Sequence, residues 1–232
     1  SVLNPLLMAI VISIVFQNFF KFAVPNFAVY YLTGSLIFNF MNEATSSAMV
    51  SIVGNAPLIK KVYIPKYIFP LEKVMFAFVN MLFSMIALVI MMGVTKLGII
   101  GSAADLNISW TIVLFFIPML YTLVFSLGLG LILAAVNVYF RDVGHLYSVW
   151  TMAWMYLTPI IYPMDIVEGT WVMNVIRLNP MYYFVTYFRD VVTNGTVPGL
   201  KTNLLCMGIS LLFLVLGLWV FKKKQDRFIL FI

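Results

Sequence analysis

The chain has 232 residues, of which 63% are hydrophobic and only 9% are charged, and its mean hydropathy is +1.05. A soluble domain carries roughly a quarter charged residues, so a soluble protein of this size could not cover its surface with so few charges. The composition therefore excludes a soluble enzyme, a nucleic-acid binder and a disordered chain. It predicts one all-α integral membrane domain over residues 1–232.

Six apolar segments predict six membrane-spanning helices, over about 5–20, 27–53, 74–94, 108–138, 146–161 and 204–221. The loops 54–73 and 139–145 and the tail 222–232 hold nine of the fourteen basic residues. Lysine and arginine gather in cytoplasmic loops, so this bias predicts that both termini are cytoplasmic. The net charge of +6 is thereby explained as topology.

The second segment carries a polar stripe that includes Asn39, Asn42 and Glu43, with serines at spacings of three and four. Residues at these spacings share one helix face. A carboxylate at this depth is costly unless it faces water or a partner, which makes Glu43 a candidate for function. The stripe either lines a substrate route or makes hydrogen bonds between helices. Both interpretations place this face away from lipid.

The loop 54–73 is the most distinctive segment, because three prolines and four lysines surround its apolar residues. Pro57 and Pro65 could each open a short helix, since proline suits the first helical turn. Such an amphipathic helix could lie on the membrane surface. It could equally dock into a groove of a partner protein, and the composition leaves both possibilities open.

The fifth segment carries an aromatic stripe with a spacing of four, made of Trp150, Trp154, Thr158 and Tyr162, with Tyr147 close by. Sugars stack their flat faces on aromatic rings, so a glycan pore could use such a stripe. From the stripe alone, an interfacial aromatic belt combined with ordinary packing is the favoured explanation.

Residues 162–192 are mixed, with apolar pieces too short to span a membrane. Irregular backbone at membrane depth is tolerated only where it is buried in protein or lines a wet cavity. We therefore expect a re-entrant hairpin of two short helices, broken near Asn179-Pro180 and placed on the outer side. An amphipathic loop lying on the outer surface is the alternative.

Catalytic motifs are absent from the sequence. No Gly-Lys dipeptide occurs, so there is no phosphate-binding loop, and no G-x-S-x-G nucleophile elbow occurs either. The single histidine, His145, and the single cysteine, Cys206, cannot build a metal cluster. The sequence thus predicts no enzyme, no catalytic or metal-binding residue and no cofactor in this chain. Work driven by ATP would require a partner that hydrolyses it.

One stretch resembles the coupling segment of permease subunits in polysaccharide-exporting ABC transporters, which export O antigen, capsule, rhamnan and teichoic acid. It reads Leu58-Ile-Lys-Lys-Val-Tyr-Ile-Pro65, followed by Phe69-Pro70-Leu71. Asn137-Val-Tyr-Phe-Arg-Asp142, Thr158-Pro-Ile-Ile-Tyr162 and Asn179-Pro-Met-Tyr-Tyr183 are similar to the same family in the same order. The resemblance covers essentially the whole chain.

The resemblance implies a homodimer of six-helix permeases in the cytoplasmic membrane of a bacterium. Two ATPase subunits beneath it would bind ATP and Mg²⁺, the substrate would be a lipid-linked polysaccharide, membrane lipids would surround the dimer, and no nucleic acid would be involved. The residues expected to couple to the ATPase are Leu58, Ile59, Lys60, Lys61, Tyr63, Pro65, Lys66 and Arg141. The expected channel residues are Asn39, Asn42, Glu43, Tyr147, Trp150, Trp154, Thr158 and Tyr162. The expected outer gate comprises Pro159, Pro163, Asn179, Pro180, Tyr182 and Tyr183.

Two other functions remain open at this point. The first is an ABC exporter for a small drug or a lipid, built on the same permease architecture. The second is an ion-coupled secondary transporter that needs no ATPase. It would be expected to show ionisable groups along its route and two inverted halves. Glu43 is the only clear intramembrane ionisable residue, and no internal repeat is found.

Overall fold

The computed structural model describes residues 3–15, 26–98 and 109–231, and all the regular elements within them are helical. The predicted all-α fold class is confirmed. The bounds of the helices are α1 Leu3–Val15, α2 Phe27–Gly54, α3 Ala56–Lys61, α4 Ile68–Lys96, η3 Trp110–Phe115, α5 Phe116–Tyr139, α6 Val143–Leu157, η4 Met164–Ile166, α7 Val172–Arg177, α8 Pro180–Val192, α9 Leu200–Lys224 and η5 Gln225–Leu230.

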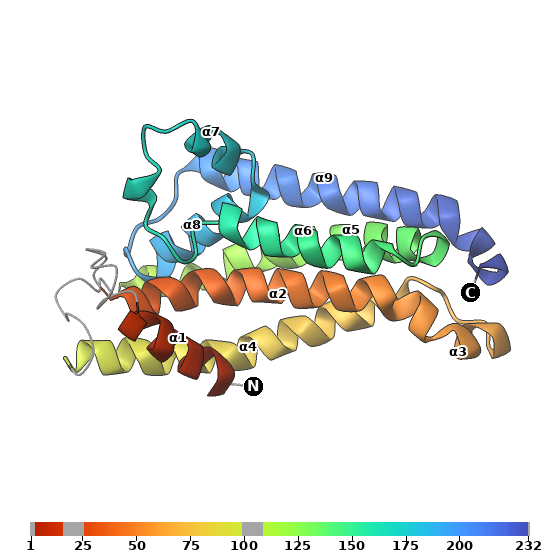
Figure 1. Ribbon diagram of the computed structural model, residues 1–232, viewed down its shortest axis with the longest axis horizontal. Helices are drawn as coiled ribbons and strands as arrows, with labels where there is room; N and C mark the ends of the chain where they lie inside the picture. The colour runs from red at the N-terminus through yellow and green to blue at the C-terminus, as the bar shows by residue number, and fades with distance from the viewer. Residues whose placement is uncertain (1–2, 16–25, 99–108, 232) are drawn as a thin grey trace.

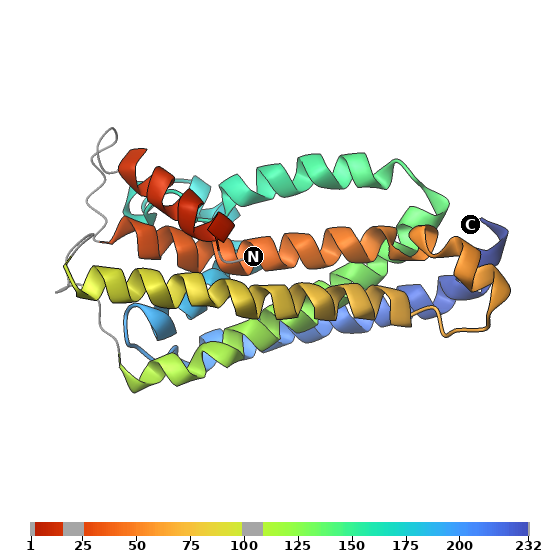
Figure 2. The ribbon, with the colours of Figure 1, turned by 90° about the horizontal axis from the view of Figure 1, so that it is seen from below.

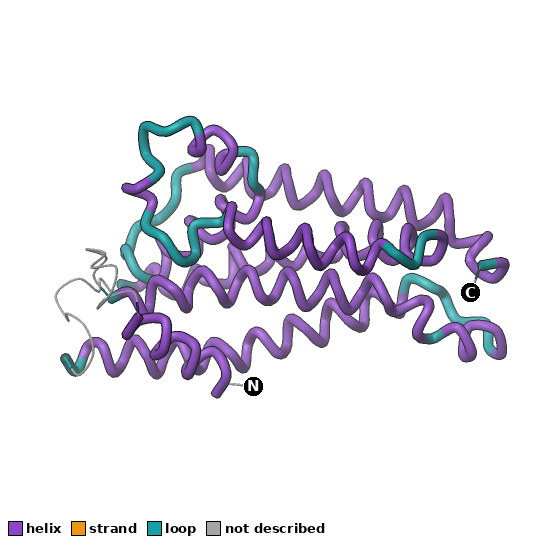
Figure 3. Tube along the Cα trace, viewed as in Figure 1, coloured by secondary structure: helices purple, strands orange, loops and turns teal. Residues whose placement is uncertain are grey.

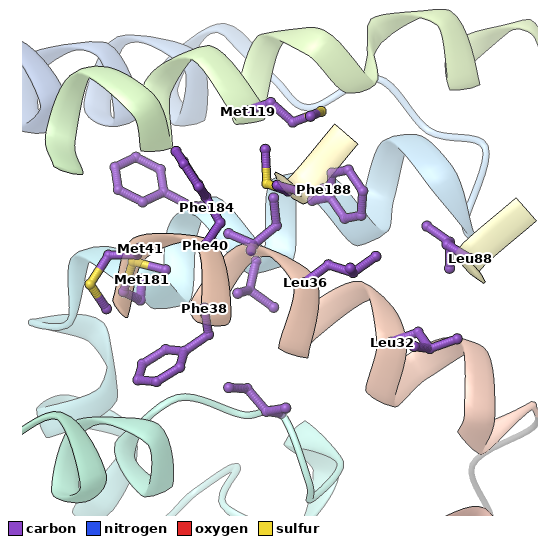
Figure 4. Packing of buried hydrophobic residues seen from close by; sticks show 14 of the residues in the cluster. Leu32, Leu36, Phe38, Phe40, Met41, Leu88, Met119, Met181, Phe184 and Phe188 are labelled. Atoms are coloured by element: carbon purple, nitrogen blue, oxygen red, sulfur yellow. The ribbon is translucent and has the colours of Figure 1, made fainter. Parts of the chain in front are cut away.

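The long helices run side by side in an elongated bundle with α2 at its centre (Figures 1 and 2). Helix α2 packs against α4 and α5, and α5 packs against α9. The central position of α2 follows from its sequence, because most of its residues are apolar or small and are buried. Figure 4 shows Phe38 and Phe40 of α2 in a core with Phe184 and Phe188 of α8.

Small residues allow α5 to approach its neighbours closely. A Cβ added to Gly128 would overlap the backbone of Phe213, and one added to Gly217 would overlap the backbone of Gly128. On another face of α5, a Cβ added to Gly130 would lie 2.9 Å from the Cβ of Ala48 in α2. Small residues permit such backbone approach between membrane helices, so these glycines determine how closely α5 packs.

The two ends of the bundle are built differently. Helix α3 and the C-terminus lie at one end, here called the α3 end, whereas α7 and α8 lie at the opposite end, here called the α8 end (Figure 1). The long non-helical stretches around η4 and α7 gather at the α8 end, and the segment between α3 and α4 lies at the α3 end (Figure 3). The candidate coupling and gate residues thus occupy opposite ends of the molecule.

Three helical stretches of the described chain are long and apolar enough to cross a membrane, namely Ile68–Lys96, Trp110–Tyr139 and Leu200–Leu230. Helix α2 has a comparable length of 28 residues, which corresponds to about 42 Å, but it carries the polar stripe. Helices α1 and α6, with 13 and 15 residues, are shorter than the roughly 20 residues that a bilayer requires. The expected first span extends to residue 20, and its part from 16 onwards lies outside the described residues.

Two of the helix boundaries that differ from the predicted spans lie beside prolines. The fifth span was expected to reach residue 161, but α6 ends at Leu157, because Thr158 precedes Pro159 and a residue before proline is disfavoured in the α conformation. The third span was expected to begin at residue 74, but α4 begins at Ile68. Pro70 lies in the first turn of α4, where proline is tolerated. The expected loop 54–73 is therefore partly helical.

Candidate functional site

One face of α2 remains open and polar. Asn39 and Glu43 are exposed on it, and Asn42 and Ser46 are half-buried. Ser46 donates to the side-chain oxygen of Asn42 at 3.2 Å. We call these residues, together with Ser35, the polar face of α2. The residues share this face because they recur every three or four positions along the helix.

A groove of about 390 Å³ lies on one side of the polar face, between α1, α2 and α4; we call it the α1 groove. Its polar lining residues are Asn4, Tyr31, Ser35, Asn39, Asn42, Glu43 and Ser84. The side-chain amide of Asn80 in α4 donates to the carboxylate of Glu43 at 2.8 Å. This hydrogen bond holds the carboxylate at the edge of the groove.

A second groove of about 680 Å³ lies between α2 and α6; we call it the α6 groove. Its polar lining residues are Asn39, Asn42, Ser46, His145, Tyr147, Ser148 and Thr151. Asn39 and Asn42 line both grooves, so the two grooves meet along the polar face. From Ser35 to Ser46 the face rises by about 16 Å along the helix axis, which makes it a track rather than a single point.

Tyr147 joins α6 to α2 at the edge of this track. Its side chain is buried, and its hydroxyl forms a 2.6 Å hydrogen bond with the hydroxyl of Thr45, in which either oxygen could be the donor. Four of the expected channel residues therefore lie together along the track: Asn39, Asn42, Glu43 and Tyr147.

The expected aromatic stripe of α6 does not form one helix face, because its last two members, Thr158 and Tyr162, lie beyond the end of the helix. Thr158 is fully buried in extended backbone. The hydroxyl of Tyr162 donates to the backbone oxygen of Tyr156 at 3.1 Å. The expected stripe of four residues on one helix face is therefore wrong, because it required a helix that continues through residue 161.

The tryptophans of α6 lie in a different groove from the polar face. Trp150 and Trp154 line an apolar groove of about 510 Å³ bounded by α5, α6, α9 and the start of α8. Trp150 is exposed, whereas Trp154 is buried. Tyr147 is the residue that this apolar groove shares with the α6 groove. The structure therefore does not bring the tryptophans and the polar face into one groove within a single chain.

Asn179 ties the end of α6 to the start of α8. Its side-chain oxygen accepts from the indole N–H of Trp154 at 2.6 Å and from the backbone N–H of Met181 at 2.9 Å, which caps α8. Its side-chain nitrogen donates to the hydroxyl of Thr158 at 2.8 Å and to the backbone oxygen of Leu157 at 3.2 Å. A buried amide with all these contacts fixes the junction between two helices.

The other expected gate residues lie around this junction. Pro163 precedes η4, and Pro180 lies in the first turn of α8. Tyr182 and Tyr183 are half-buried on α8, and the hydroxyl of Tyr183 donates to the backbone oxygen of Arg177 at 2.8 Å. Two short helices, α7 and α8, thus flank Asn179.

Arg189 of α8 is a buried charge that the sequence analysis missed. Its guanidinium donates to the backbone oxygens of Pro159 at 2.7 Å and of Tyr30 at 3.0 Å, and to the hydroxyl of Thr33 at 3.4 Å. It also lies 3.6 Å from the centre of the Tyr30 ring, in a cation–π contact. Arg189 thereby joins α8, α2 and the turn after α6. A charge within an apolar segment is the signal that could have identified it.

Gly34 provides the space that the guanidinium of Arg189 occupies. A Cβ at this position would lie 2.7 Å from Nη2 of Arg189 and 3.4 Å from Cα of Ile160. The hydroxyl of Tyr30 donates to the backbone oxygen of Tyr162 at 2.8 Å, which adds a second bond between α2 and the same turn. Pro159, an expected gate residue, is thus held through its carbonyl by Arg189.

We call residues 55–67 the α3 segment. Most of the expected coupling residues in it are exposed, namely Leu58, Lys60, Lys61, Tyr63 and Pro65. The expectation for Ile59 was wrong, because its side chain is buried. It belongs to a buried cluster that includes Phe69 and Phe228, and so anchors α3 to the bundle instead of facing a partner. Half-buried Lys66 donates to the backbone oxygen of Gln225 at 2.8 Å.

Arg141, the last expected coupling residue, is exposed in the turn between α5 and α6. Within the described residues, the one ion pair joins Glu72 and Lys73 at 3.2 Å. No group of three or more His, Cys, Asp or Glu side chains that could hold a metal ion occurs in the same part of the chain. The arrangement supplies a polar track and an exposed end surface.

Comparison with known proteins agrees with this geometry. Residues 1–193 match the family described as ABC-2 type transporter. A relative in Klebsiella pneumoniae, the O-antigen export system permease protein RfbA, is 28% identical over 230 residues, which cover 98% of this chain and 84% of that protein. A protein of the same name from Myxococcus xanthus is 25% identical over 227 residues, covering 97% and 84%. The resemblance to permeases of polysaccharide-exporting ABC transporters is confirmed.

Proposed function

The chain belongs to the ABC-2 type transporter family, and we propose that it is the transmembrane subunit of an exporter that moves a lipid-linked polysaccharide or a teichoic-acid-like polymer outward across the cytoplasmic membrane of a bacterium. The observation that carries this proposal is the polar face of α2 with its two adjoining grooves. A track of amides, hydroxyls and one carboxylate in an otherwise apolar chain suits a substrate that is rich in hydroxyl groups.

A second copy of the chain completes the passage in this proposal. The polar face is open in a single chain, and polar groups at membrane depth are stable only against water or protein. Two copies that place these faces towards each other would enclose a wet passage between them. The same arrangement would shield both faces from lipid.

The α3 end is the cytoplasmic end in this proposal. The α3 segment and the C-terminal region lie at this end and are rich in basic residues, namely Lys60, Lys61, Lys222, Lys223, Lys224 and Arg227. Cytoplasmic surfaces collect Lys and Arg. The six spans then involve α1, α2, α4, η3 with α5, α6, and α9. Helices α7 and α8 form the re-entrant outer gate, and both termini are cytoplasmic. Helix α6 is too short to cross the bilayer alone, so the gate fills the remaining thickness of the membrane beyond its end.

The ATPase docks on the exposed side of α3 in this proposal. Leu58 and Tyr63 present an apolar and an aromatic side chain there, and Lys60 and Lys61 lie beside them. Exposed apolar patches rimmed by polar residues are typical of protein-binding sites. The ATPase subunits would bind ATP and Mg²⁺, and closure of their dimer would move α3 and, through it, α2.

Surface display of the polymer tests this function. Deleting the gene in the host bacterium should remove the polymer from the cell surface and leave its lipid-linked form inside. The doubly substituted chain Asn39→Leu with Asn42→Leu should be inserted normally but should not restore display, because the track loses its hydrogen-bonding groups. Leu212→Val, on the exposed side of α9, is the matched control and should restore it. Normal display in the deletion strain would overturn the proposal.

An exporter for a small drug or lipid is the second candidate, and the apolar groove is the observation that favours it. This groove of about 510 Å³ is lined mainly by leucines and aromatic residues, which suits an apolar molecule. In that case Trp150→Ala would abolish transport of the apolar substrate and leave display of the glycan unchanged.

A further inference from the structure

The described residues that line the two grooves beside the polar face of α2 carry negative charge and no Lys or Arg charge. Glu43 is the acidic residue among the described residues that line the α1 groove and the α6 groove, and no Lys or Arg is among them. His145, near the start of α6, is the one imidazole in the same lining. A substrate that follows the track therefore passes a carboxylate without meeting a guanidinium or an ammonium group from the described lining.

The Glu43 carboxylate has accepting capacity left over. One of its oxygens accepts from Asn80 at 2.8 Å, whereas a carboxylate offers about four lone-pair sites in total. The amide of Asn39, one turn away, is exposed, and it makes no side-chain hydrogen bond within the described chain. Sugar hydroxyls can donate to the carboxylate in charge-assisted bonds, and they can both donate to and accept from the amide.

An anionic polymer meets the opposite situation. A phosphate close to a carboxylate is repelled, and the repulsion is several times stronger near a protein surface, where the effective dielectric constant is reduced, than in bulk water. In a dimer, both copies would contribute a Glu43 to the same passage. Recognition of phosphate normally uses Arg or Lys side chains or helix N-termini. The described lining contains no Arg or Lys, and the helix N-terminus that it includes is the first turn of α6, at Gly144 and His145 in the α6 groove.

We infer that the passage admits an uncharged polymer rich in hydroxyl groups and disfavours a polyanionic one, with Glu43 as the residue that sets this preference. The inference rests on the proposed function and narrows its substrate class. Of the two polymers named there, it selects a neutral polysaccharide over a phosphate-containing, teichoic-acid-like chain.

Labelling of a cysteine at position 39 tests the charge preference directly. Asn39→Cys is made in the full chain, purified as the complex with its ATPase and placed in lipid nanodiscs. It is reacted with a cationic and an anionic methanethiosulfonate of similar size. Each rate is divided by the rate of the same reagent with a free thiol in solution. The chain's own single cysteine, Cys206, is buried, so the background is low.

The corrected rate for the cationic reagent should exceed that for the anionic reagent by about tenfold or more, as expected for one or two nearby carboxylates. Adding Glu43→Gln should bring the ratio close to one, because glutamine keeps an oxygen for Asn80 while it removes the charge. Glu72→Gln, an exposed acid outside the grooves, is the matched control and should leave the ratio unchanged.

The outcomes separate this inference from the proposed function. Equal corrected rates for both reagents in the chain with Glu43 intact would overturn the charge preference and leave the water-filled passage standing. Absence of labelling by either reagent would overturn the passage itself. As a second readout, maltohexaose should enter vesicles containing the nucleotide-activated complex at least several-fold faster than its phosphate ester. Equal entry of both sugars would contradict the inference.

Discussion

At the α8 end the side chains of Asn179 and Arg189 are buried and turned inwards, whereas at the α3 end several apolar and aromatic side chains are turned outwards. Asn179 and Arg189 are each less than a tenth exposed, and together they bond to the last turn of α6, the turn after it, and α2. Tyr63 of the α3 segment is fully exposed, and Leu58 and Val62 are about half exposed. Two buried polar side chains thus fix the turn after α6 at the α8 end, whereas the α3 segment leaves several apolar side chains exposed.

The difference indicates which end fixes its geometry alone and which end requires a partner. Buried polar groups that are hydrogen-bonded specify one arrangement, because each alternative would leave a donor or acceptor unsatisfied. An exposed apolar surface gains free energy when another protein covers it. This contrast suits a gate that closes by itself and a coupling surface that depends on an ATPase. Substitutions at the two ends should therefore affect different properties.

The largest effect on stability is expected from Arg189→Met. The substitution removes the charged hydrogen bonds of the guanidinium to the backbone oxygens of Pro159 and Tyr30, together with its contact with the Tyr30 ring. A hydrogen bond to a charged group contributes about 1.5–3 kcal/mol. We therefore expect the free energy of unfolding to fall by about 3 kcal/mol, measured as a lowered unfolding temperature of the purified chain in detergent.

Arg177→Met is the matched control, because Arg177 is exposed at the end of α7. It should leave the unfolding temperature nearly unchanged, and Arg189→Lys should give an intermediate value, since lysine retains the charge but not the planar fork. If Arg177→Met lowers the unfolding temperature as much as Arg189→Met does, the buried arginine stabilises the α8 end no more than the exposed one, and the expectation is wrong.

Arg189 also shows where prediction from the sequence reaches its limit. Hydropathy predicted the helical class, and the spacing of polar residues predicted the open face of α2, because both depend on residues close together along the chain. The acceptors of Arg189 come from Tyr30, Thr33 and Pro159, up to 159 positions away. Local spacing contains no information about such contacts.

Of the two corrections, one has a local cause and the other does not. The end of α6 at Leu157 follows from Thr158-Pro159, so the chain itself contained the signal that interrupts the aromatic stripe. The burial of Ile59 did not follow from its segment alone. It depends on how α3 packs back onto Phe69 and Phe228, which belong to α4 and η5.

Ile59→Asp and Tyr63→Asp separate anchoring from docking at the α3 end. Ile59 is buried, so a carboxylate there should destabilise the fold by about 2–3 kcal/mol and lower the unfolding temperature. Tyr63 is fully exposed, so its substitution should change that temperature very little. Tyr63→Asp should instead abolish the stimulation of ATP hydrolysis by the permease in the reconstituted complex. Full stimulation with Tyr63→Asp would place the docking surface elsewhere.

Lys66→Met is expected to have the smallest effect on the free energy of unfolding. It tests most directly whether the α3 end is held less firmly than the α8 end. Lys66 makes one hydrogen bond, at 2.8 Å, to the backbone oxygen of Gln225, and its side chain is half-buried. Water can replace a partly exposed donor, so the loss should be below about 1 kcal/mol. Hydrogen exchange should rise in η5 while exchange in α8 stays unchanged, since the bond joins only the α3 segment to the C-terminal turn. A fall in the unfolding temperature as large as that of Arg189→Met would mean that the α3 end, too, is held from within.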